Sequence, residues 1–113
     1  MKFVAAFLFC CLSTLALAHH GWSEYDQEKP LTETGTIREY GYENPHGFVK
    51  LDVKGKVRLV ILAPPSRMEA RGLPKDALKA GNTVTVVGYQ NRKHAEEMRA
   101  ERITFEGKTV ELR

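Results

Sequence analysis

The sequence predicts a mainly β protein of five to six short strands and one short helix, preceded by a signal peptide. Apolar and polar residues alternate in several short segments, turns rich in Gly and Pro separate these segments, and one helical pattern lies between the third and fourth of them. A small closed sheet with a helix at this place is an OB-like β-barrel. A β-sandwich is the alternative, because a sequence does not show whether its sheet closes.

The first 18 residues have the features of a secretory signal peptide. Lys2 precedes an apolar run over 3–12, and Ala16-Leu17-Ala18 fits an A-x-A cleavage site. The run is shorter than the roughly 18 apolar residues that a membrane span needs, and no later segment is more apolar. We therefore expect a periplasmic or secreted protein that starts at His19 and has no membrane span after cleavage.

Composition limits the mature chain to one small domain. Both cysteines, Cys10 and Cys11, lie in the predicted signal peptide, so we expect no disulfide in the mature protein. The formal net charge of the whole chain is only +3, and charges of both signs are interspersed. This pattern is typical of a soluble surface and does not indicate nucleic acid as a partner.

After the signal peptide we expect an arm over 19–30 and the barrel over 31–113. The arm lacks strand or helix periodicity, and its two aromatic residues, Trp22 and Tyr25, are expected to pack it onto the barrel. The first strand is predicted within Thr32–Tyr42, which is rich in Thr, Ile and Tyr. The next two strands alternate within Gly47–Pro65, around a hairpin turn at Lys54-Gly55-Lys56.

A short helix is predicted after Pro64-Pro65. Ser66 and Glu69 have the spacing of a capping box, and Gly72 is expected to end this helix. A helical turn over Pro74–Ala80 follows. The remaining predicted strands are Thr83–Gln90, Met98–Phe105 and Thr109–Arg113.

The N-terminal histidine is the main candidate for chemistry. If cleavage follows Ala18, His19 offers two metal ligands, its α-amine and its imidazole. An α-amino group has a pKa of about 7.7 to 8.0, so it gives up its proton to a metal near neutral pH. Nitrogen-rich sites of this kind favour Cu(II), and a second histidine side chain would complete a histidine brace.

His46 in "YENPHGF" is the expected second imidazole, because Pro45 and Gly47 predict a rigid corner between two strands. His20 is a competing or additional ligand. His94, with Met98 four residues later, is a weaker pair, since His94 is expected at the surface and Met98 in the core. The simpler alternatives are a solvated tail for His19 and His20 and a turn-capping role for His46.

Six segments carry a resemblance to a known family: "HHGW", "GTI", "NPH", "LAPPSRMEARGL", "LKAGNTVTVVGYQ" and "MRAERITFEGKTVEL". Together they resemble a family of small secreted bacterial proteins that is defined only as a domain of unknown function. The paired histidines and the Asn-Pro-His corner are its most specific elements. The resemblance implies export and a small β-barrel-like fold, and it implies no activity.

Three functions are compatible with these features. The leading hypothesis is a periplasmic copper-binding protein for sequestration or handover, with His19 and His46 as ligands and His20 as a further one. Its partner would be a metal donor or acceptor protein. The second is a non-metal binding module whose barrel face takes an envelope oligosaccharide, peptide or protein, with Arg92, Lys93, Arg99 and Arg102 attracting an anionic ligand. The third is a structural accessory protein; we expect no enzyme, because no catalytic spacing stands out.

Overall fold

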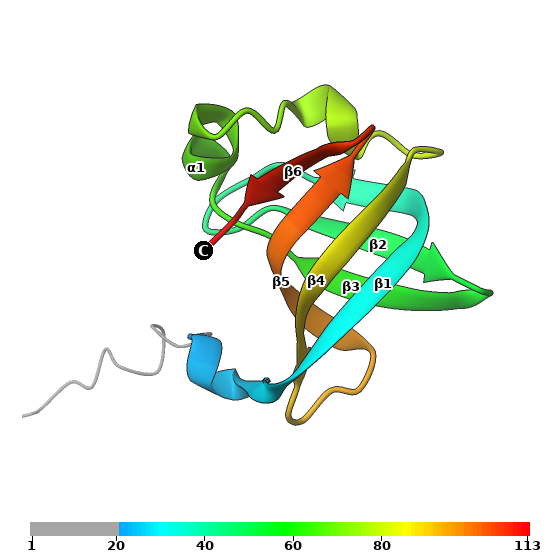
Figure 1. The fold of residues 1–113 in the computed structure, drawn as a ribbon, viewed down its shortest axis with the longest axis vertical. Helices are drawn as coiled ribbons and strands as arrows, with labels where there is room; N and C mark the ends of the chain where they lie inside the picture. The colour runs from blue at the N-terminus through cyan, green and yellow to red at the C-terminus, as the bar shows by residue number, and fades with distance from the viewer. Residues whose placement is uncertain (1–20) are drawn as a thin grey trace, which may run out of the picture.

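The alternating segments of the sequence form one six-stranded sheet in the computed structural model, which describes residues 21–113 (Figure 1). The strands are β1 (Tyr25–Gly41), β2 (Phe48–Val53), β3 (Lys56–Ile61), β4 (Thr83–Asn91), β5 (Glu97–Phe105) and β6 (Lys108–Glu111). Helix α1 spans Pro65–Ala70, and the 3-10 helices η2 and η3 span Trp22–Glu24 and Lys75–Leu78. The predicted signal peptide lies outside the described residues.

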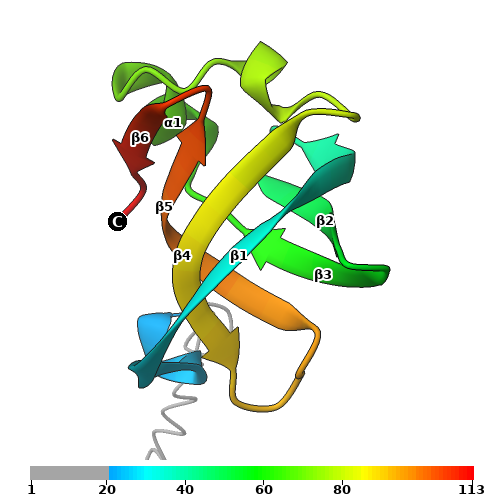
Figure 2. The ribbon, with the colours of Figure 1, turned by 45° about the vertical axis from the view of Figure 1, so that its right-hand side comes forward.

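The sheet closes into a barrel, as the OB-like prediction required. The strand order is β3-β2-β1-β4-β5-β6, and an additional parallel pairing joins β3 to β5. The long strand β1 makes this closure possible, because it pairs with β4 along its first part and with β2 along its second part (Figure 2). The alternative of an open two-sheet sandwich is therefore wrong.

Gly35 marks the place where β1 passes from β4 to β2. A Cβ atom at this position would lie 2.2 Å from the backbone oxygen of Asp52. Only glycine lets the two backbones approach so closely. Gly35 therefore permits β1 to pass from β4 to β2, and this passage is part of barrel closure.

One end of the barrel is covered by α1 and η3 (Figure 1). Met68 of α1 and Leu78 of η3 are fully buried in the core. Gly72 and Gly81 have positive φ angles, +85° and +95°, and follow the two helices as predicted. The predicted capping box is wrong: Pro64 is the N-cap, no side chain caps α1, and Ser66 lies inside the helix. Proline has a φ suited to the first helical turn, so Pro65 starts α1 one residue before Ser66.

The first strand begins earlier than predicted. β1 includes residues 25–30, which the sequence assigned to the arm. Tyr25 pairs with Asn91, and Pro30 pairs with Tyr89. Between these two pairs β1 has four residues and β4 has only one, so the β1 residues form a bulge. Residues inside such a bulge lose the alternation of buried and exposed positions, which is why this part did not show a strand pattern.

No helix within residues 21–113 is long and apolar enough to cross a membrane.

Candidate functional site

The first described residues dock on the outside of the barrel through Trp22. The guanidinium carbon of Arg99 lies 4.3 Å from the centre of the Trp22 ring, and that of Arg113 also lies 4.3 Å from it. Both guanidinium groups are thus within the distance of a cation–π contact with the indole. Tyr89 meets the ring edge-on, with ring centres 6.0 Å apart. We call these four residues, Trp22, Tyr89, Arg99 and Arg113, the tryptophan clasp.

The strand register explains how the clasp is built. Tyr89 of β4 and Arg99 of β5 are direct cross-strand partners, so both present their side chains to the same outer face. Arg99 is only 7% exposed, and burial lowers its pKa, as do the nearby positive charges of Arg67 and Arg113. The indole face attracts a guanidinium group that has been taken out of water. Trp22 therefore stabilises an arginine that the sheet has already largely buried.

Glu101 contacts two residues of the tryptophan clasp, Tyr89 and Arg113. Its carboxylate accepts a hydrogen bond of 2.6 Å from the Tyr89 hydroxyl, and it lies 3.5 Å from Nη1 of Arg113. The Tyr89 hydrogen bond is the main cause of the lowered pKa of Glu101, although some burial opposes it. One carboxylate thus connects two members of the clasp.

A second set of contacts anchors the start of β1. The Tyr25 hydroxyl donates a 2.5 Å hydrogen bond to Oε2 of Glu97, and Nδ2 of Asn91 donates to the same oxygen at 3.2 Å. Arg92 binds the backbone on the other side, because its amide donates to the Glu24 carbonyl and its Nε donates to the Ser23 carbonyl. The expectation that Trp22 and Tyr25 pack the N-terminal segment onto the barrel is confirmed.

His46 lies at the corner between β1 and β2. Two backbone hydrogen bonds hold the corner, from Gly47 to the Ala63 carbonyl at 2.9 Å and from Leu62 to the Gly47 carbonyl at 2.8 Å. The Asn44–Pro45 bond is cis. The His46 side chain is half-buried and its Nδ1 atom is shielded from solvent. The predicted corner between two strands is therefore present.

Strand β3 lies between the start of β2, near His46, and β5, which carries Arg99 of the tryptophan clasp. Phe48, two residues after His46, is opposite Ile61 of β3. Ile61 is in turn opposite Arg99 of β5. Two strand spacings, or about 10 Å, therefore separate the start of β2 from the strand that carries Arg99.

The other histidines have different positions. His94 is exposed in the loop between β4 and β5, whereas Met98 is fully buried in the core, as expected. The predicted ligands His19 and His20 lie outside the described residues. Between residues 21 and 113 no group of three or more His, Cys, Asp or Glu side chains could hold a metal ion.

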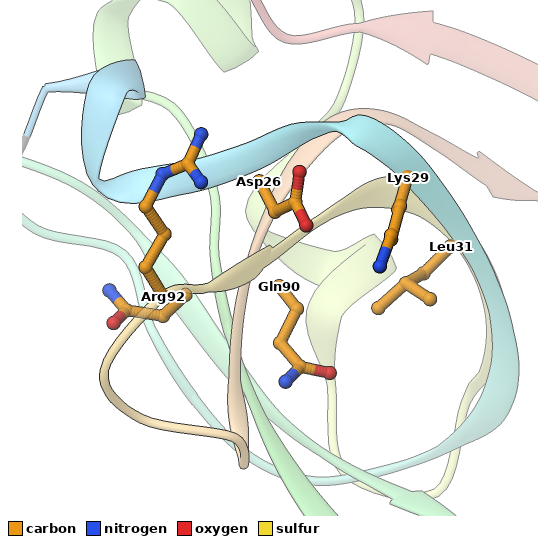
Figure 3. Close-up of a pocket in the computed structure, with 6 residues that line it drawn as sticks. Asp26, Lys29, Leu31, Gln90 and Arg92 are labelled. Atoms are coloured by element: carbon orange, nitrogen blue, oxygen red, sulfur yellow. The ribbon is translucent and has the colours of Figure 1, made fainter.

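Two hollows border the N-terminal segment. The first, of about 410 Å³, lies at the bulge of β1, where Asp26, Lys29, Leu31 and Gln90 surround it (Figure 3). Arg92 also lines this hollow, and its side chain points toward the N-terminal segment (Figure 3). The second, of about 450 Å³, includes His94 and Glu97. Charges of both signs line the two hollows, so neither selects strongly for an anion or a cation.

The four basic residues considered for an anionic ligand do not form one free surface. Arg99 lies under Trp22, and Arg92 binds the Ser23 carbonyl. Arg102 pairs with Glu111 at 2.9 Å and with Glu101 at 3.8 Å. Lys93 is exposed.

Sequence reasoning missed Tyr89, Glu101 and Arg113 as parts of this region. They come from β4, β5 and the last residue of the sequence, and no spacing along the chain connects them. The useful signal was Trp22, the one tryptophan of the chain, in a polar segment that otherwise has little to bury.

These features define a small OB-like barrel with an N-terminal segment docked on its outer face. The chain belongs to the family of unknown function DUF6152, whose model matches residues 7–99. No curated protein matches it significantly.

Solved structures share its fold at low sequence identity. A chain of the Stn1-Ten1 complex of S. pombe is 19% identical, with a TM-score of 0.54 over 67% of this chain and 57% of that chain. TiaS in complex with a tRNA and ATP is 20% identical, with a TM-score of 0.51 over 79% of this chain and 20% of that chain. The chain thus spans 57% and 20% of the length of these two structures, and the likeness shows the fold only.

Proposed function

We propose that this protein is an exported copper-binding protein, without enzymatic activity, that sequesters Cu(II) or hands it to a partner protein. The proposed ligands are the α-amine and imidazole of His19 and the imidazole of His46, with His20 as a further ligand. Export would expose the amine, because signal peptidase would cleave the chain after Ala18.

The observation that carries this proposal is the position of Trp22 relative to the His46 corner. A chain extends at most about 3.6 Å per residue, so His19 can lie no more than about 11 Å from Trp22 along the backbone. Trp22 contacts Arg99, and the register leads from Arg99 through Ile61 to Phe48, two residues after His46. This connection supports the proposal that the three residues before Trp22 bring His19 to the His46 imidazole.

The chemistry of these ligands favours copper. An α-amine and two imidazole groups supply nitrogen donors, and Cu(II) leads the divalent stability series. Arg99 and Arg113 bring positive charge to this face, which weakens the attraction of any dication. Affinity would therefore come from the coordinate bonds, and a carboxylate-seeking cation such as Ca²⁺ would not bind here.

The test is a Cu(II) titration in competition with a chelator, on a chain that starts at His19. We expect a one-to-one complex that weakens strongly in the His46→Ala variant, because one imidazole is lost. His94→Ala is the matched control, since His94 is exposed in the loop between β4 and β5, and it should bind as the parent does.

An extended chain tests the amine. A Gly-Ser-Gly-Ser extension before His19 converts the His19 amine into an amide, and binding should fall steeply. Four residues are used because one added residue would place His20 third and two would place His19 third, and either would create a different chelate from the amine, backbone amides and imidazole. Equal binding by the extended chain would contradict the brace. Salt-dependent binding of an anionic oligosaccharide that survives the chelator would favour the binding-module hypothesis instead.

A further inference from the structure

The bulge at the start of β1 forms a hollow outside the apolar core. Four residues of β1 lie opposite one residue of β4 here, and a hollow of about 410 Å³ lies against them. None of the residues that line it belongs to the cluster of buried core residues. Bulges often lie next to functional sites, because they redirect side chains, and small-molecule sites typically have volumes of about 300–1,000 Å³. The bulge therefore creates a space of suitable size for a small ligand.

The polar residues of this hollow differ in whether they already have partners. The side chains of Asn91 and Arg92 are hydrogen-bonded to neighbouring parts of the protein. The Asp26 carboxylate accepts one backbone amide at 3.2 Å, and within residues 21–113 it forms no ion pair. The Lys29 ammonium and the Gln90 side-chain amide have no hydrogen bond or ion pair in the same part of the chain. Three polar groups are therefore available to a ligand.

Asp26 and Lys29 have the same spacing as an Asp and a Lys that do form an ion pair in this chain. Nζ of Lys79 lies 3.6 Å from Oδ1 of Asp76, because side chains three residues apart are neighbours on a helical turn. In the described part of β1, Asp26 and Lys29 form no such pair. The bulged strand instead brings both side chains to the border of one hollow (Figure 3). The two opposite charges thus face the same space without neutralising each other.

We propose that this hollow binds a small zwitterion of the amino-acid class, with its ammonium group at Asp26 and its carboxylate at Lys29. An anion would be attracted by Lys29 and repelled by Asp26, and a cation would meet the reverse. Only a ligand that carries both charges is attracted at both ends. Gln90 adds a hydrogen-bond donor and an acceptor, and Leu31 adds an apolar wall (Figure 3). The site uses none of the proposed copper ligands.

The first test is calorimetric titration of the purified protein with each of the common free amino acids. A chelator is present, so that copper bound to an amino acid does not contribute. We expect at least one amino acid to form a one-to-one complex with a dissociation constant below about 1 mM. Its N-acetyl and carboxamide derivatives, which each lack one charge, should bind about fivefold more weakly or worse. If no amino acid binds, or if either derivative binds equally well, the inference is wrong.

The second test assigns each charge of the ligand to one residue. Asp26→Asn should weaken binding of the amino acid about tenfold, because Asp26 is half-buried, and it should not weaken binding of the N-acetyl derivative. Lys29→Gln should weaken binding of the amino acid about fivefold, since Lys29 is exposed, and it should not weaken binding of the carboxamide. The opposite pattern, or no effect of either variant, would contradict the proposed orientation and site.

Asp76→Asn and Lys79→Gln are the matched controls. They make the same changes of charge at the end of the barrel that α1 and η3 cover, opposite the hollow (Figure 1). Both should bind the amino acid as the parent does, and circular dichroism verifies that all four variants are folded. The nuclear magnetic resonance signal of the Gln90 side-chain amide should shift when the amino acid binds. Equal losses in the control variants, or an unchanged Gln90 signal, would place the ligand elsewhere and overturn the inference.

Discussion

Tyr25 is the residue at which the N-terminal segment becomes part of the barrel. Its side chain is 1% exposed, and its hydroxyl donates to Glu97, which also accepts from Asn91. Burial raises the pKa of Tyr25 well above its ordinary value, and the hydrogen bond to Glu97 raises it further. The neutral phenol is thus the form that the fold requires.

Tyr25→Phe should lower the free energy of unfolding by about 1–3 kcal/mol, because Glu97 loses its shortest donor. It should also change the alkaline limb of the stability curve. A phenol whose pKa is raised by folding stabilises the protein below its unfolded pKa of about 10, and this stabilisation is lost as the pH rises further. The free energy of unfolding in urea should therefore decrease less between pH 8 and pH 11 for the variant than for the parent.

Tyr40→Phe is the control for this prediction. Tyr40 packs partly against the core, and within residues 21–113 its hydroxyl makes no hydrogen bond to a carboxylate like that of Tyr25 to Glu97. An equal change of alkaline stability in both variants would show that the Tyr25 hydroxyl has no special role.

At the level of secondary-structure elements, the β4–β5 pair shapes the outer face on which Trp22 packs. Val87 pairs with Arg102 and Gly88 pairs with Ala100, so Glu101 is an extra residue in β5, as in a β-bulge. The bulge brings Glu101 to the Tyr89 hydroxyl. Gly88 permits it, because a Cβ there would lie 2.0 Å from the backbone oxygen of Arg99.

Gly88→Ala should therefore destabilise the protein by about 1–3 kcal/mol, since the two backbones would have to separate. Trp22 fluorescence should also shift toward the emission of a solvent-exposed indole, because Tyr89 and Arg99 flank the altered position. Chemical unfolding followed by Trp22 emission measures both effects. Gly21→Ala is the control for stability, since nothing lies within 4 Å of the added methyl group; similar losses in the two variants would refute the steric explanation.

At the scale of the whole molecule, the barrel is one cooperative core closed at one end by α1 and η3. Buried side chains from β1 to β6 and from both helices form a single cluster, and the described residues contain no cysteine. Packing and closure must therefore provide the stability. A metal bound at the N-terminus would add a further link between the N-terminal segment and the barrel.

Copper should stabilise the whole chain by linkage. A ligand that binds only the folded state at a free concentration about 100 times its dissociation constant adds about 2.7 kcal/mol. We expect thermal unfolding of the chain that starts at His19 to shift upward with Cu(II) and to return to the metal-free value when a chelator is added. The chain with the Gly-Ser-Gly-Ser extension should show no such shift, and an equal shift in both chains would place the copper elsewhere.

Patterns along the chain predict those parts of the fold that depend on residues close in sequence. Alternation around Val49 and Leu51 and the turn at Lys54-Gly55 fixed the β2–β3 hairpin, because period two and a positive φ are local requirements. Local patterns, the two prolines before the helix and Gly72 after it, also predicted the helix between the third and fourth strands. These patterns failed at Ser66, where the preceding prolines start the helix differently, and at residues 25–30, where a bulge removes the alternation.

Contacts between residues that are distant in the sequence became visible only in the folded barrel. Closure depends on β3 pairing with β5, although α1, η3 and β4 lie between them along the chain, and the tryptophan clasp combines residues 22, 89, 99 and 113. Sequence could name Trp22 and His46 as candidates, because their types and local turns are visible along the chain. It could not show which residues of β4 and β5 Trp22 contacts, since those contacts result from register and barrel closure, which depend on the packing of the whole core.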